Sequence, residues 1–228
     1  MKFTKIDNIP SPTHPNNYSV TNKENHIEFK LIDWTDPDQG PMMHIVQFII
    51  NGVDRTADYL RDGNKVIFGL TKYQFSDPAG RFCFIPASSS LMLVDTDTLN
   101  KMNFGKADFD FVGNIFYGDK HLVVCNDHLI VTDLHTLKST KFPFEGEPSI
   151  EWAYFVNPDL IRIIHYHSNE CSLFDLNTGR IIETRSIARE GASAWIVRSY
   201  KLEGQKNILE MIWTGGDPTH TAKFLVEE

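Results

Sequence analysis

The sequence predicts an all-β repeat protein of short antiparallel strands, and three similar segments carry that prediction. Each segment has an apolar strand that ends in an aspartate, a short turn with a threonine, and a second strand. The aspartates are Asp95, Asp133 and Asp175, spaced 38 and 42 residues apart. A period of that length accommodates about four short strands and is typical of modular β architectures. Repetition of this kind predicts a fold class and no chemistry.

The start of the chain differs from the rest in composition. Pro10, Pro12 and Pro15 fall within six positions, and such a stretch is excluded from helices and from central strands. We therefore expect residues 1–25 to form an irregular arm that lies over the domain. A single all-β domain is expected over residues 26–228.

Beyond the arm, short apolar runs alternate with turn residues. A turn-rich loop is expected at Trp34–Pro41, and Val53–Arg61 is either a short helix or strand and turn. Residues 26–31 alternate as a half-buried strand should. The further predicted strands are His44–Ile50, Lys65–Leu70, Arg81–Ile85, Leu91–Asp95, Phe109–Tyr117, His121–Cys125, His128–Asp133, Ser149–Val156, Ile161–His167, Cys171–Asp175, Ala194–Tyr200, Ile208–Thr214 and Thr221–Val226.

The segment GEPSIEWAYFVNPDLIRIIHYHSNECSLFDLNTGRIIETRSI reads as four strands with NPD, SNE and NTG turns. With Pro158-Asp159, Phe174-Asp175 and Thr178-Gly179 it resembles a β-propeller blade. In such a turn the Asp side chain accepts backbone N–H groups, and Gly179 suits a positive φ. Looser matches at Asp54 and Asp217 extend the repeat. The resemblance implies a small β-propeller of about five blades, or four blades with an N-terminal cap, in a ring without exposed edges.

The net charge and the composition limit the classes of partner that the protein can bind. A net charge of −8 and a pI of about 5.6 disfavour nucleic acid or an anionic membrane, because phosphates repel an acidic surface. The same charge suits a basic protein partner. The N-terminus lacks the apolar core of a signal peptide, and Cys83, Cys125 and Cys171 show no CxxC spacing. We therefore expect a cytoplasmic protein; its oligomeric state is left open.

Two patterns are compatible with a metal, although neither has a complete ligand set. His165 and His167 are two residues apart, so a strand would place both on one face. A third ligand, for instance Glu170 or His220, is not required by any spacing. The Asp33–Gly40 segment holds three carboxylates but lacks the regular order of a calcium loop. We expect no cofactor and no metal, and a metal-stabilised ligand-binding domain is the third hypothesis.

The carboxylates of the chain are also compatible with a hydrolase function. Glycosidases on five-bladed propellers place acids from different blades around a central pocket. Asp33, Asp110, Glu151 and Glu210 are the candidates here, each on or beside a predicted strand. The short loops between strands leave little material for a substrate pocket. A carboxylate-dependent glycoside or lactone hydrolase is therefore the alternative function.

The favoured function is a non-catalytic acidic domain that binds another, basic protein. In its narrowest form it is an immunity or inhibitor protein that neutralises a basic effector or toxin enzyme. Tryptophans beside carboxylates are the candidate contacts, because aromatics supply binding energy and charges set specificity and on-rate. The candidate residues are Asp33, Trp34, Asp36 and Asp38 as the first surface, and Glu145, Glu147, Glu151 and Trp152 as the second.

Overall fold

In the computed structural model, the residues whose placement is described are all-β apart from one short helix, and the chain divides into two compact units. The N-terminal unit is Pro12–Phe109, and the C-terminal unit combines Met1–Ser11 with Asp110–Glu228. Each is described by itself, and a single domain over 26–228 stays a prediction. The structure describes residues 2–6, 17–21, 26–36, 40–59, 65–67, 74–87, 90–105, 111–144, 149–165, 168, 170–186, 195–203, 206–213 and 221–227.

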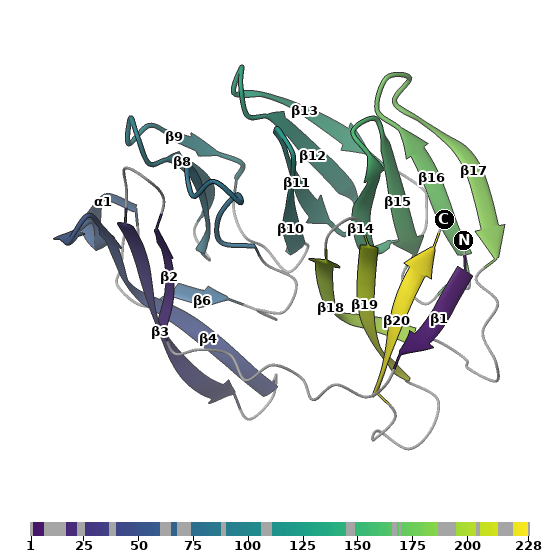
Figure 1. The fold of residues 1–228 in the computed structure, drawn as a ribbon, viewed down its shortest axis with the longest axis horizontal. Coiled ribbons are helices and arrows are strands. Elements are labelled where there is room, and N and C mark those ends of the chain that lie inside the picture. Colours follow the sequence, from purple (N-terminus) through teal and green to yellow (C-terminus); the bar gives the residue numbers. More distant parts are fainter. Residues whose placement is uncertain are drawn as a thin grey trace. The chain divides into compact units, whose positions relative to one another are not determined.

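The C-terminal unit holds three four-stranded antiparallel sheets (Figure 1). Two follow the sequence strand by strand, as the four-strand repeat predicts. The third, in the order β1-β20-β19-β18, takes its edge strand from the start of the chain. The strands are β10 (Phe111–Tyr117), β11 (Lys120–Cys125), β12 (His128–Asp133) and β13 (Lys138–Pro143); β14 (Ile150–Asn157), β15 (Leu160–His165), β16 (Glu170–Asp175) and β17 (Arg180–Ser186); β18 (Trp195–Glu203), β19 (Lys206–Trp213), β20 (Thr221–Glu227) and β1 (Lys2–Ile6).

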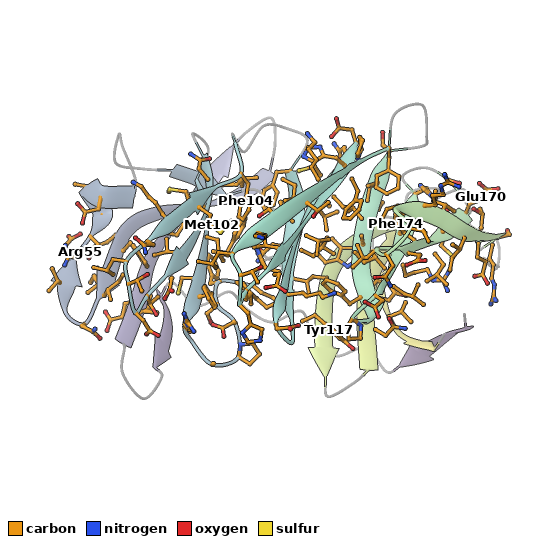
Figure 2. The ribbon with its side chains drawn as sticks, turned by 90° about the horizontal axis from the view of Figure 1, so that it is seen from above. Arg55, Met102, Phe104, Tyr117, Glu170 and Phe174 are labelled. Carbon is orange, nitrogen blue, oxygen red and sulfur yellow. The ribbon has the colours of Figure 1, made fainter. Side chains whose placement is uncertain are left out.

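The core of this unit lies between the β10–β13 sheet and the β14–β17 sheet. Phe142 and Phe144 meet Phe174 edge to face, with ring centroids 5.2 and 5.1 Å apart, and Tyr117 stacks on Phe155 at 5.0 Å. Tyr117 and Phe174 are labelled in this layer in Figure 2. Each apolar side chain of this size stabilises the fold by about 1.5–3 kcal/mol when buried. Two sheets pack face to face here, as neighbouring propeller blades do.

The N-terminal unit contains two further antiparallel sheets within the described residues. In the larger one, β2 and β5 flank the β3–β4 hairpin and β6 also pairs with β4. The smaller has the order β7-β8-β9. The number of blades and the closure of a ring stay predictions. The strands are β2 (Asn17–Thr21), β3 (His26–Asp36), β4 (Gly40–Ile50), β5 (Val53–Asp54), β6 (Lys65–Ile67), β7 (Phe82–Ala87), β8 (Ser90–Asp95) and β9 (Lys101–Asn103).

Within Val53–Arg61, the structure has a two-residue strand and then a short helix, and a turn precedes the segment. Asn51 and Gly52, with φ of 51° and 75°, form the two-residue turn between β4 and β5. Positive φ at both positions is what a type I′ hairpin turn requires. Asp54 ends β5, and α1 (Thr56–Tyr59) follows. The looser repeat match at Asp54 thus leads into a helix instead of a strand.

The irregular N-terminal arm is corrected in part. Residues 2–6 and 17–21 are regular strands, β1 and β2, each at the edge of its sheet. Both pentads lack proline, whereas the three prolines that suggested irregularity all fall between them, at residues 10–15. Edge positions fit the argument that excluded a central strand.

Candidate functional site

The three repeat aspartates occupy equivalent positions, which confirms the sequence repeat. Asp95, Asp133 and Asp175 are the last residues of β8, β12 and β16. In each turn a carboxylate oxygen accepts the N–H of the residue two positions on, at 3.0, 3.0 and 2.8 Å respectively. The threonines Thr136 and Thr178 also donate their hydroxyls, at 2.9 and 3.0 Å. The aspartates therefore fix the turns.

The fifth residue of each turn has a left-handed backbone. Its N–H donates to the carbonyl of the aspartate at 2.8 Å in all three cases. The φ angles are 59° at Leu99, 54° at Leu137 and 65° at Gly179. Glycine adopts this conformation without strain, whereas a leucine pays for the clash of its Cβ. Two of the three turns thus hold a strained residue.

In the C-terminal unit these turns and two others bring four carboxylates to one end of two neighbouring sheets. The β12–β13 and β16–β17 turns lie at the same end of their sheets (Figure 1). Asp133 pairs with Lys120 and Asp175 with Leu160, so the turns that precede β11 and β15 lie at this end as well. Those turns contribute Asp119 and Asp159, whose side chains are 48% and 58% exposed. We call Asp119, Asp133, Asp159 and Asp175 the acidic turn face.

One lysine ties the two halves of the acidic turn face together. Lys120 Nζ donates to the carbonyl of Pro158 at 2.7 Å and lies 3.8 Å from the Asp159 carboxylate. His135, 78% exposed, places Nε2 3.7 Å from Asp119. The link fixes the spacing between turns of neighbouring sheets, so the carboxylates are presented as one preorganised surface.

Hydrogen bonds hold two of the turn carboxylates in their charged form. The N–H and hydroxyl of Thr136 lower the pKa of Asp133. Burial, the largest single influence, would raise the pKa of Asp95, but the hydrogen bond (3.1 Å) and charge of Arg81 together with the backbone N–H groups of Asp97 and Thr98 outweigh it, and the pKa is lowered. Both groups therefore carry a negative charge at neutral pH.

The first predicted contact surface is only partly within the described residues. Asp33, Trp34 and Asp36 lie in β3, whereas Asp38 lies outside the described residues. The loop expected at Trp34–Pro41 is therefore corrected: strand pairing continues to Asp36, which faces Gly40 in β4. Tryptophan and threonine favour strands, and residues 37–39 lie outside the described residues.

Two residues of the second predicted surface are buried in the structure. Trp152 is fully buried and Glu151 is 5% exposed, both in β14. Glu151 is the extra residue of a β-bulge, because Ile150 and Trp152 face the consecutive residues His165 and Ile164. Neither side chain is available to a partner, so both leave the proposed surface. Glu145 and Glu147 lie outside the described residues.

The hydrolase candidates are not gathered into a pocket that the structure describes. Glu151 is buried at its bulge, and Glu210 lies within β19 opposite Lys223. Asp33 lies in β3 of the N-terminal unit. Asp110 lies outside the described residues. A glycosidase acid has to reach the glycosidic oxygen of a bound sugar, which the buried carboxylate of Glu151 does not do.

Histidines of the C-terminal unit take part in buried polar networks. His165 Nε2 shares a 2.8 Å hydrogen bond with Ser172 Oγ, which lies 3.1 Å from Thr184 Oγ1. His165 and Ser172 are 3% and 1% exposed, so this Ser–His pair links strands and is closed to a substrate. His167 lies outside the described residues. Among those that are described, no three His, Cys, Asp or Glu side chains gather around a possible metal position.

Sequence reasoning found the repeat turns but did not combine them into a surface. The signal was present: Gly118-Asp119 marks a turn one hairpin before Asp133, and Pro158-Asp159 marks one before Asp175. In a four-strand meander the first and third turns lie at the same end of the sheet. Combining those two facts predicts the acidic turn face.

Comparisons with known proteins give fold resemblance only. No family model matches the chain, and no curated protein matches it significantly. Solved structures that resemble it include the β-propeller domain of Myceliophteria thermophila Cps50 (Swd1), 12% identical with a TM-score of 0.48, where the alignment covers 91% of this chain and 73% of that one. Kuenenia stuttgartiensis hydrazine synthase is 15% identical with a TM-score of 0.48, covering 80% and 56%.

A third solved structure is the extracellular domain of a one-component system from B. thetaiotaomicron. It is 12% identical with a TM-score of 0.49, covering 86% of this chain and 25% of that one. The neighbours thus include a β-propeller domain, as the blade-like repeats led us to expect. Because all three TM-scores are below 0.5, no activity or partner is taken from these proteins. Within the described residues, no helix has the length and apolar character needed to cross a membrane.

Proposed function

We propose that this chain is a non-catalytic protein-binding domain of the cytoplasm whose partner is a basic protein. In its narrowest form it is an immunity or inhibitor protein that neutralises a basic effector or toxin enzyme. The observation that carries the proposal is the acidic turn face. Four carboxylates from two neighbouring sheets share one end of the C-terminal unit, in a chain of net charge −8.

The geometry of this face suits recognition of a basic protein more than catalysis. Asp119 and Asp159 are about half exposed, so their charge is available to a partner. Asp133 and Asp175 are fixed by hydrogen bonds from their own turns. A surface with fixed charges loses little conformational entropy on binding. It also attracts an oppositely charged protein before contact and raises the on-rate.

The experiment begins with a tagged chain used to isolate a stoichiometric partner from native lysate. Association of that purified partner is then measured by surface plasmon resonance at rising salt. The on-rate should fall steeply between low and physiological ionic strength, because salt screens exposed charges. If the partner is an enzyme, its activity should fall to zero at one equivalent of this chain.

Charge reversal locates the contact. The double variant Asp119→Lys with Asp159→Lys should reduce the on-rate and leave the fold intact, since neither carboxylate is needed by a repeat turn and Lys120 keeps its hydrogen bond to the carbonyl of Pro158. The matched control is Glu170→Lys, an exposed residue at the opposite end of β16. The proposal loses its basis if the on-rate changes neither with salt nor in the Asp119/Asp159 double variant. A partner with no net positive charge would have the same consequence.

The end of the β3–β4 hairpin is the competing surface, and it stays a prediction. Asp36→Lys with Asp38→Lys should reduce the on-rate if this hairpin makes the contact, whereas Trp34→Ala should raise the off-rate. If these variants bind normally while the Asp119 and Asp159 reversal does not, the contact lies on the acidic turn face.

A further inference from the structure

The sheet of β18, β19, β20 and β1 is assembled from both ends of the chain. All five residues of β1 pair antiparallel with β20, from Lys2 opposite Glu227 to Ile6 opposite Lys223. β1 is the edge strand of this sheet, and Figure 1 shows it beside β20. The fourth strand is therefore supplied without a hairpin to its neighbour.

The chain passes from the C-terminal unit to the other unit between β1 and β2. Residues Met1–Ser11 belong to that unit, whereas Pro12–Phe109 form the other one. Ten residues separate Ile6 from Asn17 in β2, and a chain of that length reaches up to about 33–36 Å. Because no short turn fixes β1 to β20, the ladder itself holds the strand in place. A backbone ladder is the same whether the strand comes from its own chain or from another.

We propose that the edge of β20 is an acceptor site for β1 of a second copy of this chain. Two molecules then exchange their first strands reciprocally, which gives a closed dimer with two-fold symmetry. The fit of the occupant is established, since the chain's own β1 fills the same site in the same register. This interaction is independent of the acidic turn face.

Concentration decides between the two arrangements. Both contain the same ladders, so they differ mainly in the entropy of association. Because β1 and β20 belong to one chain, the chain's own β1 competes intramolecularly, at an effective concentration that can be of the order of millimolar. Isolated molecules at micromolar concentration therefore keep their own strand. Exchange is expected when concentrated chains are unfolded and refolded together, because the site and the strand then form in the presence of other copies.

The test uses two single-cysteine variants, Thr4→Cys and Leu225→Cys. These positions are opposite each other in the β1–β20 ladder, and opposite residues of antiparallel strands lie within disulfide range. The variants are mixed, unfolded in urea, refolded at high concentration and oxidised. A covalent heterodimer on a non-reducing gel is the expected result. The native Cys83, Cys125 and Cys171 are buried, which keeps them from competing in the folded protein.

The control pair is Thr4→Cys with Ile208→Cys. Ile208 faces Leu225 from the other side, in β19, so it is one strand further from Thr4. Several-fold more heterodimer from the Leu225 pair than from the Ile208 pair supports exchange. Equal yields from both pairs, or no heterodimer from either, overturn it.

A single chain that carries both Thr4→Cys and Leu225→Cys tests the ladder itself at micromolar concentration. An intramolecular disulfide shows that the two positions react when β1 is docked, so a missing heterodimer then means that strands do not exchange. Failure to form even this disulfide overturns the register on which the proposal rests. Neither outcome changes the salt dependence expected for a basic partner.

Discussion

His121 should make the free energy of unfolding depend on pH. The residue lies in β11, fully buried and stacked on Phe116 with ring centroids 4.5 Å apart. Its Nε2 is 3.1 Å from the side-chain nitrogen of Asn114. An amide N–H only donates, so the ring nitrogen accepts and the imidazole is neutral. Burial lowers the pKa of His121 to about 3.

The magnitude follows from proton linkage. Histidine in an unfolded chain has a pKa of about 6.5, so below that pH the unfolded chain binds a proton that the folded protein refuses. Stability therefore falls as the pH drops from about 6.5 towards the folded pKa. At pH 5, about 1.5 pH units below the unfolded pKa, the cost is about 2 kcal/mol relative to pH 8, at about 1.36 kcal/mol per unit.

The assay is urea unfolding at several pH values between 8 and 5, for the native protein and for His121→Gln. Glutamine keeps a group that accepts the Asn114 hydrogen bond and does not titrate. The variant should be less stable at pH 8, by about 1–3 kcal/mol for an altered core residue. That deficit should shrink by about 2 kcal/mol at pH 5. His135→Gln reports the effect of deleting an exposed histidine, and parallel pH profiles for native protein and His121→Gln would refute the reasoning.

Two further predictions concern the repeat turns and metal. Gly179→Ala should lower the free energy of unfolding by about 1–2 kcal/mol, because a Cβ is strained at φ of 65°. Leu137→Gly relieves the same strain and should leave the free energy of unfolding unchanged or raise it. Equal losses of stability in both variants would show that φ does not govern these turns. EDTA should leave Tm unchanged, because the described residues contain no complete ligand set; a drop of many degrees, or stoichiometric metal by elemental analysis, would contradict this.

Local sequence patterns were sufficient to predict the strands and the repeat turns. An apolar run before each aspartate specified β8, β12 and β16, and the Asp–Thr pair specified the turns. The left-handed backbone at the fifth position of the turn could be predicted from the sequence only at Gly179. At Leu99 and Leu137 there is no glycine to indicate a positive φ. In those turns the hydrogen bonds of the aspartate outweigh the cost of a leucine with positive φ.

Features that depend on contacts between residues distant in the sequence could not be predicted from local sequence patterns. Trp152 stands next to a carboxylate, as an exposed contact residue would, yet packing of the β14–β17 sheet against its neighbour buries it completely. Trp34 lies near turn residues, but pairing with β4 extends the strand past it. The pairing of β1 with β20 leaves no local pattern, because the two segments lie at opposite ends of the sequence.

That last pairing also sets an order of events during synthesis. β1 ends at Ile6 and β20 ends at Glu227, so the ribosome adds 221 residues between the two strand ends. At a translation rate of about 5–20 residues per second, β1 waits roughly 11–45 s for its partner strand. The β10–β13 and β14–β17 sheets use neighbouring segments and can form during that time. β1 lacks its partner strand during that time, and the two lysines in its sequence KFTKI are of the kind that disfavours pairing of an edge strand with other chains.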